Sequence, residues 1–212
     1  LACNKPRILA HPLGNGQGDF RVVAPLTAVR KAGLATECVW RQRVQGMARF
    51  FTSAEISRLK PTSFIAQNYI QDFSLAVLDE WNTSSDRPFI VYALDDLIND
   101  LDITNPFRKN IPPNARSRLK YALARCDRLV VSTDFLAETY RHFISDIKVV
   151  ANRLQKDIWC PLTTLKRTTK KPRIGWAGGS THHGDLLLLK EIIEQTREEA
   201  DWIFFGMCPD EI

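Results

Sequence analysis

The sequence predicts an α/β fold built on a parallel sheet. Short apolar runs rich in β-branched residues alternate with stretches of helical periodicity, as expected where helices cross between parallel strands. The run Pro88–Leu94 is apolar without interruption, which is typical of a strand buried on both faces of a parallel sheet. About six such runs precede residue 151, and a further strand–helix–strand unit follows residue 171.

Glycine and proline punctuation and the change of hydrophobic period place the individual elements. The runs expected to form strands are Arg7–Leu13, Ala35–Trp40, Ser63–Gln67, Pro88–Leu94, Arg128–Ser132, Ile147–Val150, Arg173–Ala177 and Trp202–Phe205. The expected helices follow Asp19 up to Gly33, cover Ser53–Leu59, Gln71–Trp81, Pro112–Ala124 and Phe135–Phe143, and open again near Asp185. Residues 101–110 are expected to be loop, and the strand Arg173–Ala177 is expected to be buried.

The order of elements predicts one domain over residues 1–160, a linker over 161–171 and the beginning of a second domain over 172–212. One strand–helix–strand unit cannot form a domain alone, so further domains of the same polypeptide are expected. A hydrophobic content of 44% and a charged content of 25% are those of a globular protein, and no apolar run reaches the roughly 20 residues that span a bilayer.

The charge and the cysteines restrict the partners. The net charge of +5 can attract nucleic acid, anionic lipid or phosphorylated substrates. The densest basic cluster, Lys166–Lys171, is short and lacks a nucleic-acid signature, so it is interpreted as a solvated linker and no nucleic acid is expected. Five scattered cysteines without a CxxC pair indicate neither a zinc site nor a disulfide framework, and favour a reducing cytoplasm.

Three features fall at the carboxyl ends of expected strands, where open α/β sheets bind ligands. The first is the loop that contains Gly14, Asn15, Gly16 and Gly18. Asp19 occupies the position where a dinucleotide fingerprint needs its last glycine, so NAD binding is not expected. The loop either admits a ligand close to the backbone or is a plain turn.

The second feature is the pair Asp95 and Asp96, which follows the run Pro88–Leu94. Adjacent residues of a strand point to opposite faces, so we expect at most one of these carboxylates to face a cleft. Such a carboxylate can accept a proton from an attacking hydroxyl. The alternative is a helix cap or an ion pair with a neighbouring arginine.

The third feature is a turn after the strand Arg173–Ala177, with the residues Gly178, Gly179, Ser180, Thr181 and His182. Its glycines and the helix that follows suit a phosphate or a sugar. His182 and His183 are adjacent, which is not the i,i+4 spacing of two zinc ligands on a helix, so no metal is expected. An ordinary strand–turn–helix without a ligand is the alternative. His11, at the end of the first expected strand, is a fourth candidate, though such a histidine often only packs.

The order of these segments resembles that of a known family. GNGQGDFRVVAPLTAVRKAG, YALDDL, ARCDRLVVST, VVANRLQKDIW and RIGWAGGSTHHGDL follow one another as in bacterial glycosyltransferases of the GT-B fold, more narrowly the group 1, family four-like enzymes of surface polysaccharide assembly. The resemblance covers Arg7 to about Gly206. It implies two facing Rossmann-like domains, here a complete acceptor-side domain and the beginning of a truncated nucleotide-sugar-binding domain.

The resemblance implies transfer of a sugar from a nucleoside-diphosphate sugar to a hydroxyl of a saccharide or glycolipid, without a cofactor or an essential metal. It implies that the glycine loop lies near the donor phosphates and that the turn Gly178–His182 contacts the donor phosphates or the acceptor. It also implies that Asp95 or Asp96 faces the cleft from the acceptor side, with Asp95 as the candidate base, and that Asn152 marks the strand end where the chain crosses between domains. A cytoplasmic location, including the inner face of the membrane as a peripheral protein, is implied as well.

The resemblance has one departure. The paired glutamates that bind the donor in the family, seven residues apart, have no counterpart in this sequence, so the chain by itself is expected to be inactive. A non-catalytic α/β binding module that keeps half of the GT-B fold therefore remains an alternative. A nucleotide-dependent oxidoreductase is disfavoured by the failed dinucleotide fingerprint.

Overall fold

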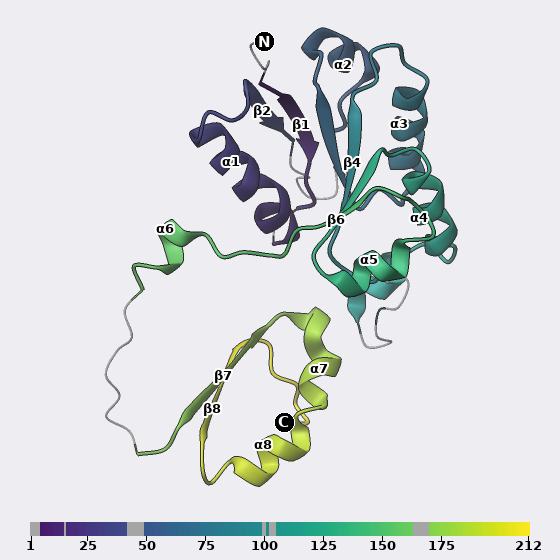
Figure 1. Ribbon diagram of the computed structural model, residues 1–212. Coiled ribbons are helices and arrows are strands. Elements are labelled where there is room, and N and C mark those ends of the chain that lie inside the picture. Colours follow the sequence, from purple (N-terminus) through teal and green to yellow (C-terminus); the bar gives the residue numbers. More distant parts are fainter. Residues whose placement is uncertain (1–4, 15, 42–48, 99–100, 102–104, 163–169) are drawn as a thin grey trace. The chain divides into compact units, whose positions relative to one another are not determined.

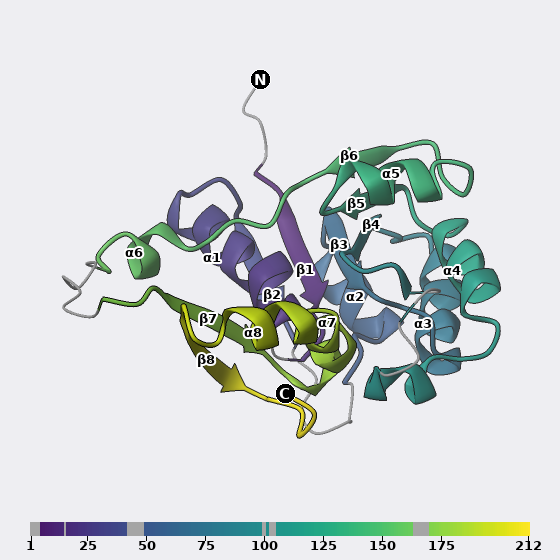
Figure 2. The ribbon, with the colours of Figure 1, turned by 90° about the horizontal axis from the view of Figure 1, so that it is seen from below.

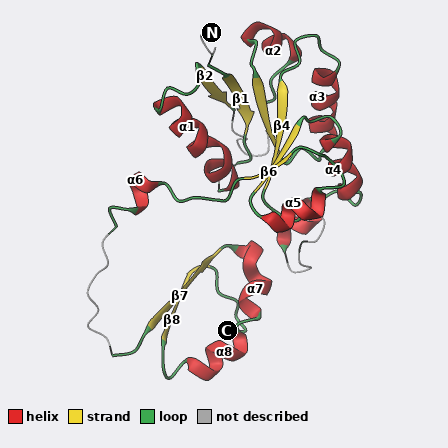
Figure 3. Cartoon of the chain, viewed as in Figure 1, coloured by secondary structure: helices red, strands yellow, loops and turns green. Residues whose placement is uncertain are grey.

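The computed structural model describes residues 5–14, 16–41, 49–98, 101, 105–162 and 170–212 (Figure 1). The chain divides into two compact units. The first unit consists of Leu1–Leu97 and Asn114–Pro161, and the second of Ile98–Pro113 and Leu162–Ile212. Strands and helices alternate along the chain, as Figure 3 shows by colour.

A six-stranded sheet forms the centre of the first unit, and each of its neighbouring strands pairs in parallel. The spatial order is β2-β1-β3-β4-β5-β6. The strands are β1 (Arg7–His11), β2 (Glu37–Trp40), β3 (Ser63–Gln67), β4 (Phe89–Leu94), β5 (Arg128–Val131) and β6 (Ile147–Val149). This confirms the predicted α/β class and a Rossmann-like parallel sheet, and it brings all six carboxyl ends to one edge.

Helices cover both faces of this sheet. They are η1 (Asp19–Val23), α1 (Ala24–Lys31), α2 (Ser53–Leu59), α3 (Asp72–Asn82), α4 (Ala115–Leu123) and α5 (Asp134–Tyr140). The short helix α6 (Lys156–Trp159) follows on an exposed segment and does not cover the sheet (Figure 1). Figures 1 and 2 show α1 on one face, and α3 and α4 on the other. On the α1 face, Val22 and Leu26 pack with Ala10 of β1. On the other face, the fully buried Trp81 of α3 meets the ring of Phe64 of β3, with ring centroids 4.3 Å apart.

Most predicted elements are present, and their ends differ by local hydrogen bonding. The helix predicted from Pro112 begins later, because the first helical bond runs from Arg118 N–H to the carbonyl of Asn114, 3.0 Å away. The segment predicted as loop over residues 101–110 contains a 3₁₀ turn, η3 (Pro106–Asn110). The short helix α6 was not predicted, because its four residues are too few to show a helical period.

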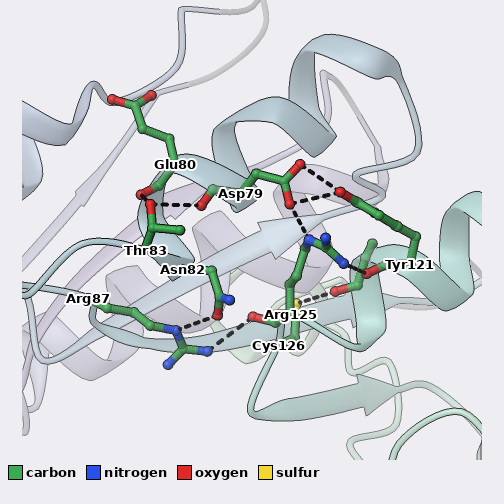
Figure 4. Close-up of polar contacts among 9 residues, drawn as sticks. Asp79, Glu80, Asn82, Thr83, Arg87, Tyr121, Arg125 and Cys126 are labelled. Atoms are coloured by element: carbon green, nitrogen blue, oxygen red, sulfur yellow. Dashed lines mark hydrogen bonds and ion pairs between the residues drawn. The ribbon is translucent and has the colours of Figure 1, made fainter.

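Strand β4, which leads to Asp95, is anchored at its amino end by Asp127. The carboxylate of Asp127 accepts hydrogen bonds from Ile90 N–H at 2.6 Å and from Arg87 Nη1 at 2.8 Å. Arg87 also donates to Asn82 Oδ1 and to the carbonyl of Arg125, each at 3.0 Å (Figure 4). These bonds join α3, β4 and the turn before β5.

Helices α3 and α4 are joined by the charged group next to this anchor. Asp79 of α3 accepts a hydrogen bond from the hydroxyl of Tyr121 at 2.8 Å and forms an ion pair with Arg125 (Figure 4). The guanidinium of Arg125 lies 3.3 Å from the centroid of the Tyr121 ring. Asp79, Tyr121 and Arg125 therefore join α3 to α4 and to the turn that follows it.

The second unit contains a two-stranded parallel sheet and short helices. Its strands are β7 (Arg173–Gly178) and β8 (Asp201–Gly206), and its helices beyond η3 are η4 (Ser180–His182), α7 (His183–Leu187) and α8 (Lys190–Thr196). Leu186 and Ile193 are buried under the sheet. The prediction that the strand Arg173–Ala177 is buried was wrong, because most of β7 is exposed with only β8 as its partner among the described residues.

Candidate functional site

The loop after β1 brings the backbone into a compact turn through two glycines. Gly16 has a φ of +78°, a conformation that residues with a side chain rarely adopt. A Cβ on Gly18 would lie 2.0 Å from the carbonyl oxygen of Leu13, so no side chain fits there. The N–H of Phe20 then donates to the carbonyl of Gly16 at 3.1 Å and starts the wide turn η1. The glycines thus serve this turn, whether or not a ligand approaches it.

Asp95 and Asp96 follow β4 directly and lie in different environments. Asp95 is half-buried, and Asp96 is exposed. Gln17 Nε2, from the loop after β1, donates a hydrogen bond to Asp96 Oδ2. The carbonyl oxygen of Asp95 accepts a hydrogen bond from Ser132 Oγ at 3.3 Å.

The two carboxyl groups differ in electrostatics as well. Burial, and after it the neighbouring carboxylate of Asp96, raise the pKa of Asp95 to about 6 against the opposing charge of Arg21. A carboxyl group with a pKa near 6 is largely ionised at neutral pH and can still take up a proton readily. Asp95 therefore has the properties of a general base.

Arg21 is the cation whose charge acts on Asp95, and its side chain joins η1 to the segment after β6. Its Nη1 donates to Asn152 Oδ1 at 3.1 Å and to the carbonyl of Val150. Burial lowers the pKa of the guanidinium, and the charge of Asp95 partly restores it. Arg21 was not among the residues predicted from the sequence. It could have been noticed as a basic residue near the start of a predicted helix, where the helix dipole disfavours positive charge.

The loops after β1, β4 and β6 line an open cavity of about 350 Å³ within the first unit. Pockets for small ligands begin at about this size. The wall combines backbone, amide, carboxylate and guanidinium groups with two apolar side chains, from Gly16, Gln17, Phe20, Asp95, Asn152, Arg153 and Leu154. The structure thus brings together three of the predicted residues, Gly16, Asp95 and Asn152, although they lie far apart in the sequence.

The other candidates near the first sheet take different positions. His11 is fully buried as the last residue of β1, and its ring contacts those of Phe50 and Tyr69, with centroids 4.5 and 5.7 Å away. It is part of the core. Gly14 lies in the turn between β1 and Gly16, and Asn15 is outside the described residues.

The predicted glycine turn belongs to the second unit. Its residues Gly178, Gly179, Ser180, Thr181 and His182 run from the end of β7 through η4. A Cβ on Gly178 would lie 2.5 Å from the ring of Trp176, so packing within the unit accounts for this glycine, whereas a Cβ on Gly179 would meet nothing within 4 Å. His182 Nδ1 lies 2.7 Å from Asp185 Oδ2, and both side chains are exposed. The imidazole is thereby oriented by a carboxylate one turn away.

The described residues form neither a metal-binding cluster nor a membrane-spanning helix. No group of three or more His, Cys, Asp or Glu side chains suited to a metal ion occurs in the part of the chain that the structure describes. The described helices include none with both the length and the apolarity to cross a bilayer. The cysteines at 38, 126, 160 and 208 are free thiols. Neither family models nor curated protein sequences contain a match to this chain.

Proposed function

We propose that the chain is the acceptor-side part of a glycosyltransferase that moves a sugar from a nucleoside-diphosphate sugar to a hydroxyl group in polysaccharide or glycolipid assembly. The proposal rests on Asp95. This carboxylate lies beyond the end of a central strand, lines a cavity of about 350 Å³ and has a pKa of about 6. The resemblance of the ordered sequence segments to GT-B enzymes supports the reaction class.

In the proposed reaction Asp95 acts as the general base. The acceptor hydroxyl gives its proton to the Asp95 carboxylate, and its oxygen forms a bond to the anomeric carbon of the donor sugar. The bond between that carbon and the diphosphate oxygen breaks, and the nucleoside diphosphate leaves with the electron pair. Asn152 and Gln17 line the same cavity and offer amide groups that can orient sugar hydroxyls.

The other predicted residues have roles in the same proposal. The glycine loop at Gly16 and Gly18 is proposed to lie near the donor phosphates. The turn Gly178–His182 is proposed to contact the donor phosphates or the acceptor, with Ser180, Thr181 and His182 as hydrogen-bond donors. The protein would act in the cytoplasm, where its free cysteines stay reduced. No metal ion is needed for the proposed steps.

The experiment that tests the proposal separates binding from turnover. Because the chain by itself is expected to be inactive, the assays use the whole polypeptide of which it is proposed to be the acceptor-side part. Saturation-transfer NMR with UDP-, GDP- and dTDP-sugars reports donor binding by that polypeptide. Release of nucleoside diphosphate in the presence of methyl glycosides of glucose, galactose, mannose and N-acetylglucosamine reports transfer. We expect Asp95→Asn to lower turnover by about 100-fold or more, the usual effect of losing a general base, and to leave donor binding unchanged.

Asp96→Asn is the matched control, because it removes the same charge from the adjacent residue. We expect it to lower turnover less than tenfold. Donor binding without any transfer by the wild-type whole polypeptide would overturn the catalytic proposal and favour a non-catalytic binding module. Failure of all three classes of nucleotide-sugar to bind to that whole polypeptide would overturn both.

A further inference from the structure

Two residues of one short segment reach the two carboxylates after β4. Gln17 lies two residues before η1 and Arg21 lies within it, so one short segment carries both side chains. Gln17 donates a hydrogen bond to Asp96, and Arg21 acts electrostatically on Asp95. The two adjacent carboxylates therefore have different partners in this segment: Asp96 has a hydrogen bond and Asp95 has a nearby positive charge.

We propose that Arg21 is a positioning residue of the candidate site, which secures Asn152 on the cavity wall and keeps the carboxylate of Asp95 available as a proton acceptor. The inference rests on the proposed role of Asp95 as a general base. Arg21 itself is not among the residues that line the cavity, so it acts through Asp95 and Asn152.

The geometric part of the inference concerns the segment after β6. The guanidinium of Arg21 is half-buried, and its Nη1 is shared between the carbonyl of Val150 and Oδ1 of Asn152. Residues 152–154 form one wall of the cavity. A planar guanidinium can hold two acceptors in fixed directions, which a lysine ammonium on a flexible stem does less well. Arg21 therefore fixes this wall against η1.

The electrostatic part concerns the charged groups around Asp95. They are Arg21 from η1 and Asp96 from the same strand end; Arg153, from the segment after β6, lines the same cavity. Burial and Asp96 favour the neutral acid, and Arg21 favours the carboxylate. Without Arg21, more of Asp95 would carry a proton at neutral pH and could not accept another.

The test is an NMR titration of the Asp95 side-chain carboxyl carbon between pH 4 and pH 8 in the full chain, with no donor or acceptor added. We expect a midpoint at about pH 6 in the wild type. We expect Arg21→Gln to raise the midpoint by about one pH unit, the lower end of the effect of an opposite charge nearby. Arg21→Lys keeps the charge, and we expect its midpoint within about 0.3 unit of the wild type.

The side-chain amide signals of Asn152 give a second readout. We expect them to move in both Arg21→Gln and Arg21→Lys, because neither side chain offers the guanidinium geometry. Arg30→Gln is the matched control: it removes the same charge from the exposed end of α1, where the guanidinium lies over Trp40. We expect it to change neither the Asp95 midpoint nor the Asn152 signals.

An Asp95 midpoint in Arg21→Gln within 0.3 unit of the wild type would overturn the electrostatic part of the inference. Unchanged Asn152 signals would overturn the geometric part. If Arg21→Gln does not fold by circular dichroism, Arg21→Met, which keeps the packing of the stem, takes its place in the same titration. Because the titration needs no turnover, its result is independent of whether the chain transfers a sugar.

Discussion

Replacement of Asp127 by alanine tests how the fold holds β4, the strand that leads to Asp95. The substitution removes the acceptor of the buried Ile90 N–H, a bond of 2.6 Å, and the partner of Arg87 at 2.8 Å. A hydrogen bond to a charged group contributes about 1.5–3 kcal/mol, and a partly exposed ion pair up to about 1 kcal/mol. We therefore expect Asp127→Ala to lower the free energy of unfolding by about 3 kcal/mol.

Thermal unfolding followed by circular dichroism measures this loss. In a chain of this size about 3 kcal/mol corresponds to a fall in Tm of about 6–12 °C. Asp127→Asn keeps an oxygen for the Ile90 N–H and loses only the charge, so we expect a fall of about 1 kcal/mol. Asp86→Ala removes the same charge from an exposed position nearby, and we expect it to stay within about 0.5 kcal/mol of the wild type.

A Tm of Asp127→Ala within 1 °C of the wild type would refute this reasoning. An equal fall in Asp86→Ala would refute it too, because the loss would then come from general charge rather than from the bonds to β4. We also expect the Asp95 titration to be unchanged in Asp127→Ala, because the two residues lie at opposite ends of β4.

Three further predictions concern the site and its surroundings. Hydrogen bonds from Arg41 and from the backbone N–H of Thr52 lower the pKa of Glu55 to about 2. The Arg41–Glu55 pair therefore stabilises the fold above the ordinary pKa of a glutamate, and this contribution is lost as the pH falls toward 2. Glu55→Gln should make the free energy of unfolding fall less steeply with decreasing pH, and an unchanged acid side of the stability–pH curve would contradict this. Asp95 behaves oppositely, because its raised pKa costs stability once the pH rises from about 4 through about 6, so Asp95→Asn should raise the Tm at pH 8 and not at pH 4. Gly18→Ala should destabilise by about 2–3 kcal/mol through its clash with Leu13, and Gly16→Ala, which only adopts an unfavourable φ, by about 1–2 kcal/mol; urea unfolding that ranks them in the reverse order would argue against this geometry of the loop.

The alternation of strands and helices could be predicted from the sequence because each element carries its own local period. The run before Asp95 reads as a buried strand in any context, and the parallel sheet then places Asp95 at its carboxyl edge. The different environments of Asp95 and Asp96 follow from the alternation of side chains along a strand only in part. The hydrogen-bond partner of Asp96 is Gln17, which lies 79 positions away, and no local pattern predicts that contact.

The parts that could not be predicted depend on contacts between distant segments. The hydrogen bond of Arg21 to Asn152 joins residues 131 positions apart, and no local sequence pattern predicts it. Burial of β7 was overestimated because its apolar residues resemble those of a central strand, whereas only β8 pairs with it among the described residues. The glycine at position 178 suggested a ligand, and the ring of Trp176 is what occupies the space of its missing side chain.

The pH dependence of nucleoside diphosphate release tests the central claim, that Asp95 accepts the proton of the acceptor hydroxyl, most directly. The account predicts that the wild-type rate falls as the pH drops below about 6, where Asp95 takes up a proton, and that Asp95→Asn lowers the rate by about 100-fold or more and abolishes this limb. A rate in Asp95→Asn equal to that of the wild type, with the same acid limb, would contradict the account.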